Sequence, residues 1–450
     1  MYLFYSLILT IGFLLLLPRF LFDALRHGKY VTGFWQKFGF LPKVERNGKK
    51  TIWLHCVSVG ETQASEPLVK AILERFPQYN LVVSTTTKTG QQLAREKFAK
   101  YAALIFYFPF DWRFTVRRAL KKIKPDVVLI LETELWFNFL RECRLHNVQI
   151  ALVNGRLSEK SFGRYGLIRN FIRRALSDLD LALMSGEADA QRIIELGCDP
   201  KKVSVTGNLK FDVAKNAGQV ELLETFRQRF GFDENQFLIV AASTHEPEEQ
   251  IVFAAFQKVF AVIAQKKTRL LIAPRHPEKF NKTAEMLAKS KSKWVRRSAS
   301  DSLADKTAEV ILFDSVGELR SIFPLAEIVF VGGSLVPHGG HNVLEPIAAQ
   351  KAVVTGYYTF NFAAITKSFA EQNALVQLPK ITQSEVIDVL ASTFIELLND
   401  DIKRNLLNEN AQAILEANRG AAEKSINQLQ KLIGHNGAFE ARQLAFANSK

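Results

Sequence analysis

Short runs of apolar and β-branched residues alternate with amphipathic stretches along most of the chain. Such runs are typical of strands that are buried on both faces of a parallel sheet. In the first half they occur at residues 51–57, 81–86, 127–131, 149–153, 181–184 and 203–206, with helical patterning at 61–75 and 89–100. This alternation predicts an α/β domain in which helices cover a parallel sheet.

A second series of strand-like runs occupies the second half of the chain. It comprises residues 237–242, 269–273, 310–313, 328–331 and 352–355, and helical patterning follows at 407–433. A polar, small-residue stretch between the two series predicts an interdomain linker at 213–220. We therefore expect two Rossmann-like domains, at 29–212 and 221–420, that face each other across a cleft. A helical segment is expected to follow at 421–450.

The first segment has a different pattern. Residues 2–17 are nearly all apolar, and Pro18 and Arg19 follow them. A helix of this length covers about 24 Å, slightly less than the ~30 Å hydrocarbon core of a bilayer. A secretory signal peptide is the main alternative, but no basic residue precedes the run and no small-x-small cleavage site follows it. We expect an uncleaved membrane anchor at 1–28, with Arg19, Arg26 and Lys29 holding the rest of the chain on the cytoplasmic side.

The charge of the chain indicates an anionic partner. The formal net charge is +14 over 450 residues, and the 35 phenylalanines often lie close to Lys or Arg. Nucleic acid, phospholipid headgroups and phosphorylated substrates would all suit such a charge. The mixture of aromatic and basic residues fits a membrane interface at least as well as a nucleic-acid groove.

The cysteines indicate neither a disulfide framework nor a metal site. Cys56, Cys143 and Cys198 are odd in number and far apart, and no Cys/His cluster accompanies them. We expect buried free thiols in a reducing compartment.

Glu61 is the first candidate for chemistry, because it follows the predicted 51–57 strand and the turn expected at Gly60. A carboxylate at this place could act as a general base that takes the proton of an acceptor hydroxyl. The alternative is structural, since Ser58-x-x-Glu61 is also a capping box. The helix start would then lower the pKa of Glu61 and make it a weaker base.

Other polar residues follow neighbouring strands of the first domain. Glu132 and Glu134 come directly after the 127–131 strand and could orient an acceptor or shape the charge around Glu61. The alternative for this pair is a polar helix start. Asn154-Gly155-Arg156 offers donors suited to an anionic group, and Lys210 in the segment 207–212 could stabilise a departing phosphate. A surface lysine beside a linker is the ordinary alternative for Lys210.

The second domain carries a candidate nucleotide-phosphate site. Pro274-Arg275-His276 and Gly332-Gly333-Ser334 each end a predicted strand, and the segment 339–346 follows closely. Successive glycines can form a nest of backbone N–H groups for phosphate oxygens, next to the helix start expected near Asn342. Glu345 could accept hydrogen bonds from ribose hydroxyls. A tight turn would account for the glycines alone, but not for the Arg, His, Asn and Glu beside them.

One more segment mixes basic and apolar residues. Arg164, Arg169, Arg173 and Arg174 are interleaved with Phe162, Tyr165, Ile168, Phe171 and Ile172. This stretch could lie on a membrane surface or hold a phosphorylated lipid head. A solvated helix face packed on the sheet is an equally good interpretation.

Taken together, these segments resemble the bacterial 3-deoxy-D-manno-octulosonic acid (Kdo) transferases of lipopolysaccharide synthesis. The matching pieces are the anchor, Ser58-Val59-Gly60-Glu61, Glu132-Thr133-Glu134-Leu135-Trp136, Asn154-Gly155-Arg156, Gly207-Asn208-Leu209-Lys210-Phe211-Asp212, Pro274-Arg275-His276-Pro277, Gly332-Gly333-Ser334 and Asn342-Val343-Leu344-Glu345. The resemblance implies a GT-B glycosyltransferase at the inner membrane, with CMP-Kdo as donor and a lipid A precursor as acceptor. It implies no nucleic-acid partner.

The resemblance also implies roles for individual residues. Glu61 matches the family's general base, and Glu132 and Lys210 match positions that support the transition state. The segments that hold CMP correspond to Pro274-Arg275-His276, Gly317-Glu318-Leu319 and Asn342-Val343-Leu344-Glu345, with Gly332, Gly333 and Ser334 beside them. Ser58, Gly60 and Arg156 are candidates for contacts to the acceptor. We identify no Asp-x-Asp motif of the kind that grips a metal-bound nucleotide, so a reaction without metal or other cofactor is expected.

Two other functions remain open from the sequence. The first is another GT-B enzyme, such as a UDP-sugar transferase or a nucleotide-sugar epimerase. The second is a membrane-tethered protein without enzyme activity that binds anionic lipid or nucleic acid through its positive charge.

Overall fold

The computed structural model describes residues 2–27, 33–44, 47–213, 220–263, 266–382 and 384–434. The chain divides into two compact units. Unit 1 comprises Met1–Val213 and Asn418–Lys450, and unit 2 comprises Ala214–Ala417. Most of the linker predicted at 213–220 lies outside the described residues, as do Met1, Gly28 and residues 435–450 of the predicted terminal segments. The cleft expected between the two domains stays a prediction.

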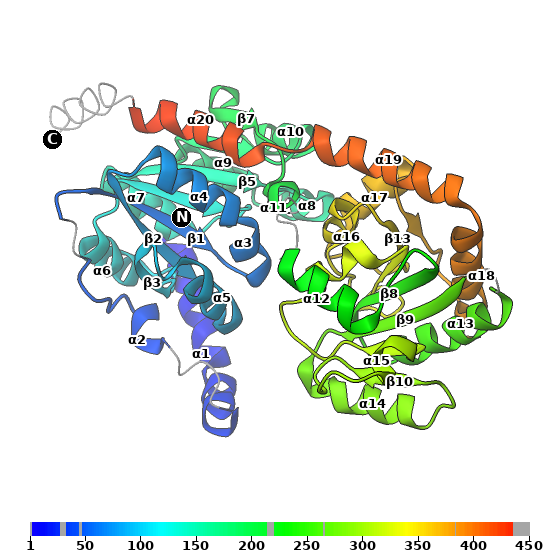
Figure 1. Ribbon diagram of the computed structural model, residues 1–450. Helices are drawn as coiled ribbons and strands as arrows, with labels where there is room; N and C mark the ends of the chain where they lie inside the picture. The colour runs from blue at the N-terminus through cyan, green and yellow to red at the C-terminus, as the bar shows by residue number, and fades with distance from the viewer. Residues whose placement is uncertain are drawn as a thin grey trace, which may run out of the picture. The chain divides into compact units, whose positions relative to one another are not determined.

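Unit 1 is built on a parallel sheet (Figure 1). Its seven strands among the described residues have the order β3-β2-β1-β4-β5-β6-β7. They are β1 (Lys50–Cys56), β2 (Tyr79–Thr85), β3 (Ala102–Tyr107), β4 (Val127–Leu131), β5 (Gln149–Gly155), β6 (Leu181–Met184) and β7 (Val203–Val205). The six strands predicted from the sequence are all present within two residues at each end. β3 was missed by the sequence analysis, although Ala102–Tyr107 is a continuous apolar run; it is an edge strand, and only its last two residues are buried.

Helices cover both faces of this sheet. They are α3 (Val59–Ala64), α4 (Glu66–Arg75), α5 (Lys88–Phe98), α6 (Arg113–Ile123), α7 (Phe137–Leu145), α8 (Glu159–Gly166), α9 (Arg169–Ser177), α10 (Glu187–Glu195), α11 (Leu209–Val213) and α20 (Ala421–Gly434), with the short turn η1 (Pro200–Lys202). Side chains of α6, α7, α9 and α10 form the core on one face, and those of α3, α4, α5 and α20 form it on the other. The α/β architecture with two-sided helix cover is therefore confirmed for this unit.

Two helical predictions differ in detail from the structure. The single helix expected at 61–75 is two helices, α3 and α4, because Pro67 near the start of α4 lacks a backbone N–H. The run at 407–433 is also two helices, separated at Gly420 with φ +83°. The second of them, α20, belongs to unit 1 and packs on α4 (Figure 1). Asp212 fixes its start by accepting the N–H groups of Gly420 and Ala422, each at 2.7 Å.

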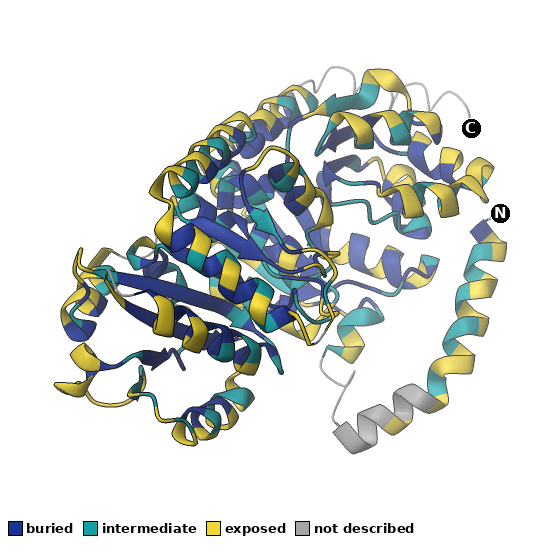
Figure 2. Cartoon of the chain, turned by 90° about the vertical axis from the view of Figure 1, so that its right-hand side faces the viewer, coloured by how far each residue is buried: buried dark blue, intermediate teal, exposed yellow. Residues whose placement is uncertain are grey.

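The apolar first segment forms helix α1 (Tyr2–His27), which is followed by the short helix α2 (Phe34–Lys37). Polar side chains of α1 contact the rest of unit 1: the Tyr5 hydroxyl donates to Asp111 at 2.9 Å, and Trp112 donates to Thr10 at 3.1 Å. Much of α1 is exposed (Figure 2), and its exposed large apolar side chains include Leu3, Phe4, Leu7, Ile8, Ile11, Leu14 and Leu15. Over the described residues, no helix combines the length and apolarity needed to cross a bilayer.

Unit 2 repeats the parallel architecture. Its described strands have the order β10-β11-β9-β8-β12-β13-β14. They are β8 (Gln236–Thr244), β9 (Lys267–Pro274), β10 (Trp294–Arg296), β11 (Val310–Leu312), β12 (Ile328–Val331), β13 (Ala352–Thr355) and β14 (Val376–Gln377). The five predicted strands are confirmed. β10 and β14 were not predicted, because each is short, half-buried and at an edge.

The helices of unit 2 connect these strands. They are α12 (Val220–Phe230), α13 (Glu248–Val262), α14 (Phe280–Ala288), α15 (Ala304–Thr307), α16 (Leu344–Ala348), α17 (Ala363–Glu371), α18 (Val386–Asn399) and α19 (Asp401–Ala417), with the short turns η2 (Pro277–Lys279), η3 (Leu319–Ser321) and η4 (Phe323–Leu325). Figure 2 shows buried strands with helices whose outer faces are exposed. All three cysteines are buried free thiols, as expected.

Candidate active site

Loops at one edge of the unit 1 sheet carry the polar residues predicted from the sequence. Ser58 and Glu61 follow β1, Glu132 follows β4, Arg156 follows β5 and Lys210 lies in α11 after β7. β1 and β4 are neighbours at the point where the strand order reverses. Ligands bind at such switch points in open parallel sheets, outside the carboxyl ends of the strands. The position therefore suits a reacting group.

Glu61 lies in the first turn of α3 and is only 5% exposed. Its Oε2 accepts the backbone N–H of Val57 at 2.7 Å, and its Oε1 accepts the hydroxyl of Ser58 at 2.8 Å. Ser58 is the N-cap and accepts the N–H of Glu61 at 3.3 Å. The N-cap half of the capping box that the sequence offered as an alternative is thus present, but the Glu61 carboxylate reaches the N–H of Val57, one residue before the N-cap.

The capping box does not make Glu61 a weak base. Burial raises the pKa of Glu61 from 4.5 to about 7, helped by the charges of Glu132 and Glu134 and opposed by the bonds from Val57 and Ser58. The expectation that the helix start would lower this pKa is therefore wrong, because desolvation outweighs two hydrogen bonds. A carboxyl group with a pKa near 7 can take up and return a proton at neutral pH.

Two cations accompany the carboxylates. The Oε1 atom of Glu132 lies 3.5 Å from Lys210 Nζ and 3.8 Å from Arg156 Nη1. Burial lowers the pKa of Lys210, whereas Glu132 and Glu61 raise it. Glu61 is thus within electrostatic reach of Lys210. Burial and Glu132 also raise the pKa of Glu134 to about 7.

Backbone contacts hold these loops in place. Glu132 has a left-handed backbone, with φ +54°, and its N–H donates to Val153 O at 3.0 Å. The hydroxyl of Thr133 donates to Arg156 O and accepts the N–H of Arg156 at 2.9 Å. Such a backbone conformation is costly for a residue other than glycine and persists only where neighbouring contacts enforce it. The site in unit 1 is therefore organised before any ligand binds.

Among the acceptor candidates, the expectation for Gly60 needs a correction. The sequence placed a turn there, but Gly60 lies inside α3 without a positive φ. A Cβ atom at this position would meet only Ser58 Oγ, at 3.9 Å. The glycine is thus not required by the backbone, and it leaves open space beside the first turn of α3.

The glycine nest of unit 2 also needs a correction. The N–H groups of Gly333, Ser334 and Leu335 donate to the carboxylate of Glu248 at 2.6, 2.9 and 2.8 Å, and Gly332 N–H donates to Ala242 O at 2.8 Å. These amides are therefore occupied and do not offer themselves to a phosphate. The hydroxyl of Ser334 is engaged as well, since it donates to Val331 O at 2.6 Å and accepts Gly356 N–H at 2.8 Å.

Glu248 is a structural residue of this loop that the sequence analysis missed. It is buried, follows β8 and accepts a fourth backbone N–H, from His245 at 2.9 Å. Burial raises its pKa, and the four N–H donors oppose that shift. The signal was present in the sequence: His245-x-x-Glu248 repeats, after the central strand of the second sheet, the spacing of Ser58-x-x-Glu61.

The predicted ribose contact has a partner inside the protein. Glu345 Oε1 accepts Arg320 at 2.6 Å and Asn342 Nδ2 at 3.2 Å. The side chains of Val343 and Leu344 are buried in the core, so these two residues can reach a nucleotide only through their backbone. The segment that the resemblance assigned to CMP thus presents Asn342 and Glu345.

The remaining donor candidates follow β9 and β11. Arg275 and His276 are exposed after Pro274, and Arg275 N–H donates to Thr244 O at 2.9 Å. Gly317 has φ +90°, and Glu318 accepts Arg297 at 3.2 Å just before Leu319 begins the turn η3. Arg275 is therefore an exposed cation at the carboxyl end of the sheet of unit 2.

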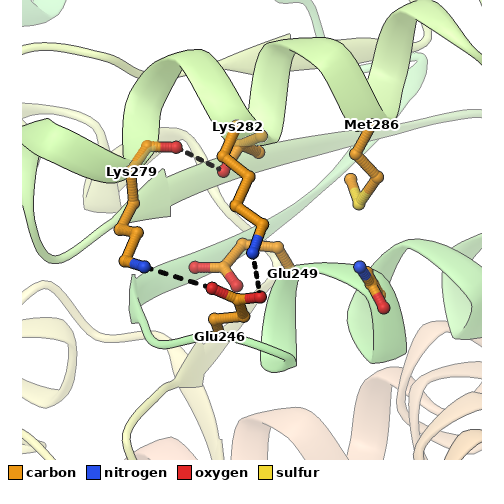
Figure 3. Close-up of a pocket in the computed structure, with 7 residues that line it drawn as sticks. Glu246, Glu249, Lys279, Lys282 and Met286 are labelled. Atoms are coloured by element: carbon orange, nitrogen blue, oxygen red, sulfur yellow. Dashed lines mark hydrogen bonds and ion pairs between the residues drawn. The ribbon is translucent and has the colours of Figure 1, made fainter.

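A small hollow of unit 2 is balanced in charge (Figure 3). Glu246 lies between Lys279, at 3.2 Å, and Lys282, and both lysines direct their ammonium groups to its carboxylate. These ion pairs lower the pKa of Glu246. Because the lysines already have a partner, we assign no ligand to this hollow.

Comparisons with known proteins agree with the geometry. The sequence profile described as "3-Deoxy-D-manno-octulosonic-acid transferase (kdotransferase)" matches residues 32–213. A 3-deoxy-D-manno-octulosonic acid transferase of Haemophilus influenzae is 31% identical over 92% of this chain and 94% of its own. The protein of that name from Bordetella pertussis is 30% identical over 85% of this chain and 87% of its own.

Among solved structures, a putative UDP-N-acetylglucosamine 2-epimerase of Listeria monocytogenes matches with a TM-score of 0.58. It is 14% identical and covers 87% of this chain and 97% of its own. This likeness shows the fold, and the predicted GT-B class with two parallel sheets is confirmed.

Proposed function

We propose that this chain, which belongs to the 3-deoxy-D-manno-octulosonic acid transferase family and is a glycosyltransferase, moves Kdo from CMP-Kdo to a lipid A precursor with inversion at the sugar carbon. The observation that carries the proposal is the buried Glu61 carboxyl at the switch point of unit 1, with its pKa of about 7. A group of this kind is what the attack of an acceptor hydroxyl requires.

The proposed reaction is a single displacement. Glu61 takes the proton of an acceptor hydroxyl, and the oxygen forms a bond to the anomeric carbon of Kdo. The bond from that carbon to the phosphate oxygen breaks, and its electron pair leaves with CMP. Because attack comes from the face opposite the leaving group, the configuration inverts. General-base catalysis of this kind contributes roughly 10²- to 10⁴-fold.

Lys210 and Glu132 support this step in the proposal. Lys210 is mostly buried and pairs with Glu132 at 3.5 Å. Its ammonium group is also within electrostatic reach of Glu61. A fixed cation beside developing negative charge stabilises a transition state more than it would in water. Arg156, which shares Glu132, is proposed to contact an anionic group of the acceptor.

On the donor side, Arg275 is proposed to contact the phosphate of CMP. Glu345, which Arg320 and Asn342 hold in place, is proposed to accept a ribose hydroxyl. The free amides once expected in the glycine nest play no part, because Glu248 occupies them. A reaction without a metal ion remains part of the proposal.

We also propose that α1 attaches the enzyme to the cytoplasmic face of the inner membrane. Its polar side chains are engaged by unit 1, whereas Leu3, Leu7, Ile11 and Leu15 are exposed. Contiguous exposed apolar side chains are typical of interaction sites, and a lipid acceptor lies in a membrane.

The membrane proposal can be tested by flotation with vesicles of anionic phospholipid. Replacing Leu7 and Ile11 by Glu should abolish co-flotation. The matched control replaces Leu303 and Ile402, two exposed apolar residues of unit 2, and should float like the wild type. Equal flotation of both variants would contradict the proposal.

The function itself is tested by incubating the protein with CMP-Kdo and a tetraacylated lipid A precursor, with products analysed by mass spectrometry. The expected product is heavier by one or more Kdo units, with CMP released, and a strong chelator should leave the rate unchanged. A preference for a UDP-sugar would overturn the donor assignment. Salt-sensitive lipid binding without any turnover would favour the non-enzymatic alternative.

A further inference from the structure

Four of the eight histidines of the chain gather at the carboxyl end of the unit 2 sheet. His245 follows β8, His276 follows β9, and His338 and His341 lie in the loop after β12. The ring of His245 stacks on His338 with centroids 4.3 Å apart, and its centroid lies 5.1 Å from that of His276. β8 and β12 are neighbours at the switch point of this sheet, the place where a ligand is expected.

Two of these rings share a hydrogen bond. His245 Nε2 and His341 Nε2 are 2.8 Å apart, and the two ring planes differ by only 5°. One of the two nitrogens must carry the proton and the other must accept it. Burial, together with the neighbouring His276, His338 and Arg275, lowers the pKa of His245 to about 4 and that of His341 to about 3. In the unliganded protein this pair is therefore neutral at pH 7.

Among the residues that the structure describes, two of the three carboxylates near the pair have other partners, and the third, Glu278, faces His276. Glu248 is bound by four backbone N–H groups, and Glu246 turns to Lys279 and Lys282 (Figure 3). The carboxylate of Glu278 lies 3.8 Å from Nδ1 of His276. Over the described residues, no three His, Cys, Asp or Glu side chains lie so that they could hold a metal ion. An excess of donors beside the exposed Arg275 is suited to an anion.

We infer that the His245–His341 pair, on which His338 stacks, donates a hydrogen bond to the phosphate oxygen that leaves the sugar, beside the proposed contact of Arg275 with the same phosphate. This inference rests on the proposed function, because it takes CMP-Kdo as the donor. It assigns a hydrogen-bond-donating role to His245, which the sequence analysis had not considered, and to His341, which the sequence analysis treated only as part of a longer segment.

The charge changes of the reaction fit such a cluster. In CMP-Kdo the phosphate is a diester with a single negative charge. When the bond between the sugar carbon and the phosphate oxygen breaks, the electron pair stays on that oxygen and the product is a monoester, whose second pKa is about 6. The acceptor proton is on Glu61, and the new charge on CMP is met by N–H of the histidine pair. A dianion placed here favours protonated imidazole, so binding of CMP takes up protons.

The test is calorimetry on the full chain at pH 7 with CMP, cytidine and inorganic phosphate, each in two buffers of different ionisation enthalpy. The variants are His341→Gln and His245→Gln, which keep a polar side chain. His146→Gln in unit 1 is the matched control, because His146 lies outside the cluster and bonds only to α7. Thermal unfolding of each variant is recorded to verify that unit 2 is folded.

We expect wild-type protein to take up protons on binding CMP and not on binding cytidine. Either cluster variant should weaken the binding of CMP by about 10-fold or more, as the loss of a hydrogen bond to a charged group does. The binding of cytidine should be unaffected. Proton uptake should fall in step. Equal weakening of CMP and cytidine, unchanged CMP binding, or wild-type protein that binds neither CMP nor phosphate would overturn the inference.

The experiment separates this inference from the proposed function. Suppose that binding of UMP and phosphate depends on the histidines as binding of CMP does, and that the protein does not prefer CMP. The anion site is then supported and the assignment of CMP-Kdo as donor is wrong. If the protein prefers CMP but the histidine variants bind CMP as tightly as the wild type does, then the donor assignment is supported and the anion site is wrong. A folded His338→Gln variant, which loses only the stacking ring, should show a weaker effect of the same kind.

Discussion

The two sheets place a buried glutamate at corresponding positions, with opposite consequences. Glu61 follows β1 and Glu248 follows β8, and each lies three residues after the residue that begins the turn. Each also accepts a nearby backbone N–H, from Val57 at 2.7 Å and from His245 at 2.9 Å. Up to this point the two arrangements are alike.

The difference lies in the number of further donors. Glu61 receives only the Ser58 hydroxyl and faces the carboxylates of Glu132 and Glu134. Glu248 receives three more backbone N–H groups from the loop after β12. A carboxylate with four fixed donors holds a loop in place, whereas one with two donors and like charges nearby can exchange a proton. The comparison separates a structural carboxylate from the proposed catalytic one on the same kind of scaffold.

The largest effect is expected from Glu61→Gln. This change keeps the shape and an acceptor for Val57 N–H, but removes the base. Turnover of CMP-Kdo should fall by roughly 10²- to 10⁴-fold, while CMP affinity in unit 2 stays within about twofold. Steady-state kinetics and calorimetry on the same preparation measure both. Near-normal turnover would remove Glu61 from the mechanism.

Glu248→Gln should instead damage the fold of unit 2. The amide NH₂ would meet backbone N–H groups that now donate to Oε1 or Oε2, and buried donors would lose their acceptor. We expect the free energy of unfolding to fall by about 2–4 kcal/mol, since each unsatisfied buried donor costs about 1–3 kcal/mol. Glu249→Gln is the matched control, because Glu249 is also buried but accepts the Thr244 hydroxyl rather than the N–H groups of the loop after β12. Equal stability of the two variants would contradict the structural role of Glu248.

The sequence predicted the arrangement around Glu61 in unit 1 but not the one around Glu248 in unit 2. Strand positions and the location of Glu61 followed from buried apolar runs and from the rule that polar residues gather at carboxyl ends. The role of Gly333 and Ser334 did not follow, because their amides are filled by Glu248, which is 85 residues distant from Gly333 along the chain. The raised pKa of Glu61 was also beyond reach, since it depends on burial that local spacing does not report.

Stability should depend on pH through Glu61. Its pKa in the folded protein is raised from 4.5 to about 7, so the charged form is less favourable folded than unfolded. The resulting loss of stability is absent below pH 4.5, grows as the pH rises, and is complete above pH 7, at up to about 3 kcal/mol. Denaturation of wild-type protein and Glu61→Gln at a series of pH values measures it as their difference. A difference that is constant with pH would show an ordinary pKa.

Ser58→Ala should have the smallest effect. It removes the N-cap of α3 and one of the two donors to Glu61. We expect a loss of about 1 kcal/mol in unfolding free energy. Because the Ser58 hydroxyl lowers the pKa of Glu61, its loss should also move the pH–rate profile to higher pH. A shift to lower pH would contradict this account of the capping box.

The most direct test of the catalytic role of Glu61 is the pH dependence of kcat/KM for Kdo transfer by the wild-type enzyme. A base that must be ionised predicts a rate that rises tenfold per pH unit at low pH and levels off above a midpoint near 7. A rate that is flat from pH 5 to pH 9, or one that falls as Glu61 ionises, would contradict it.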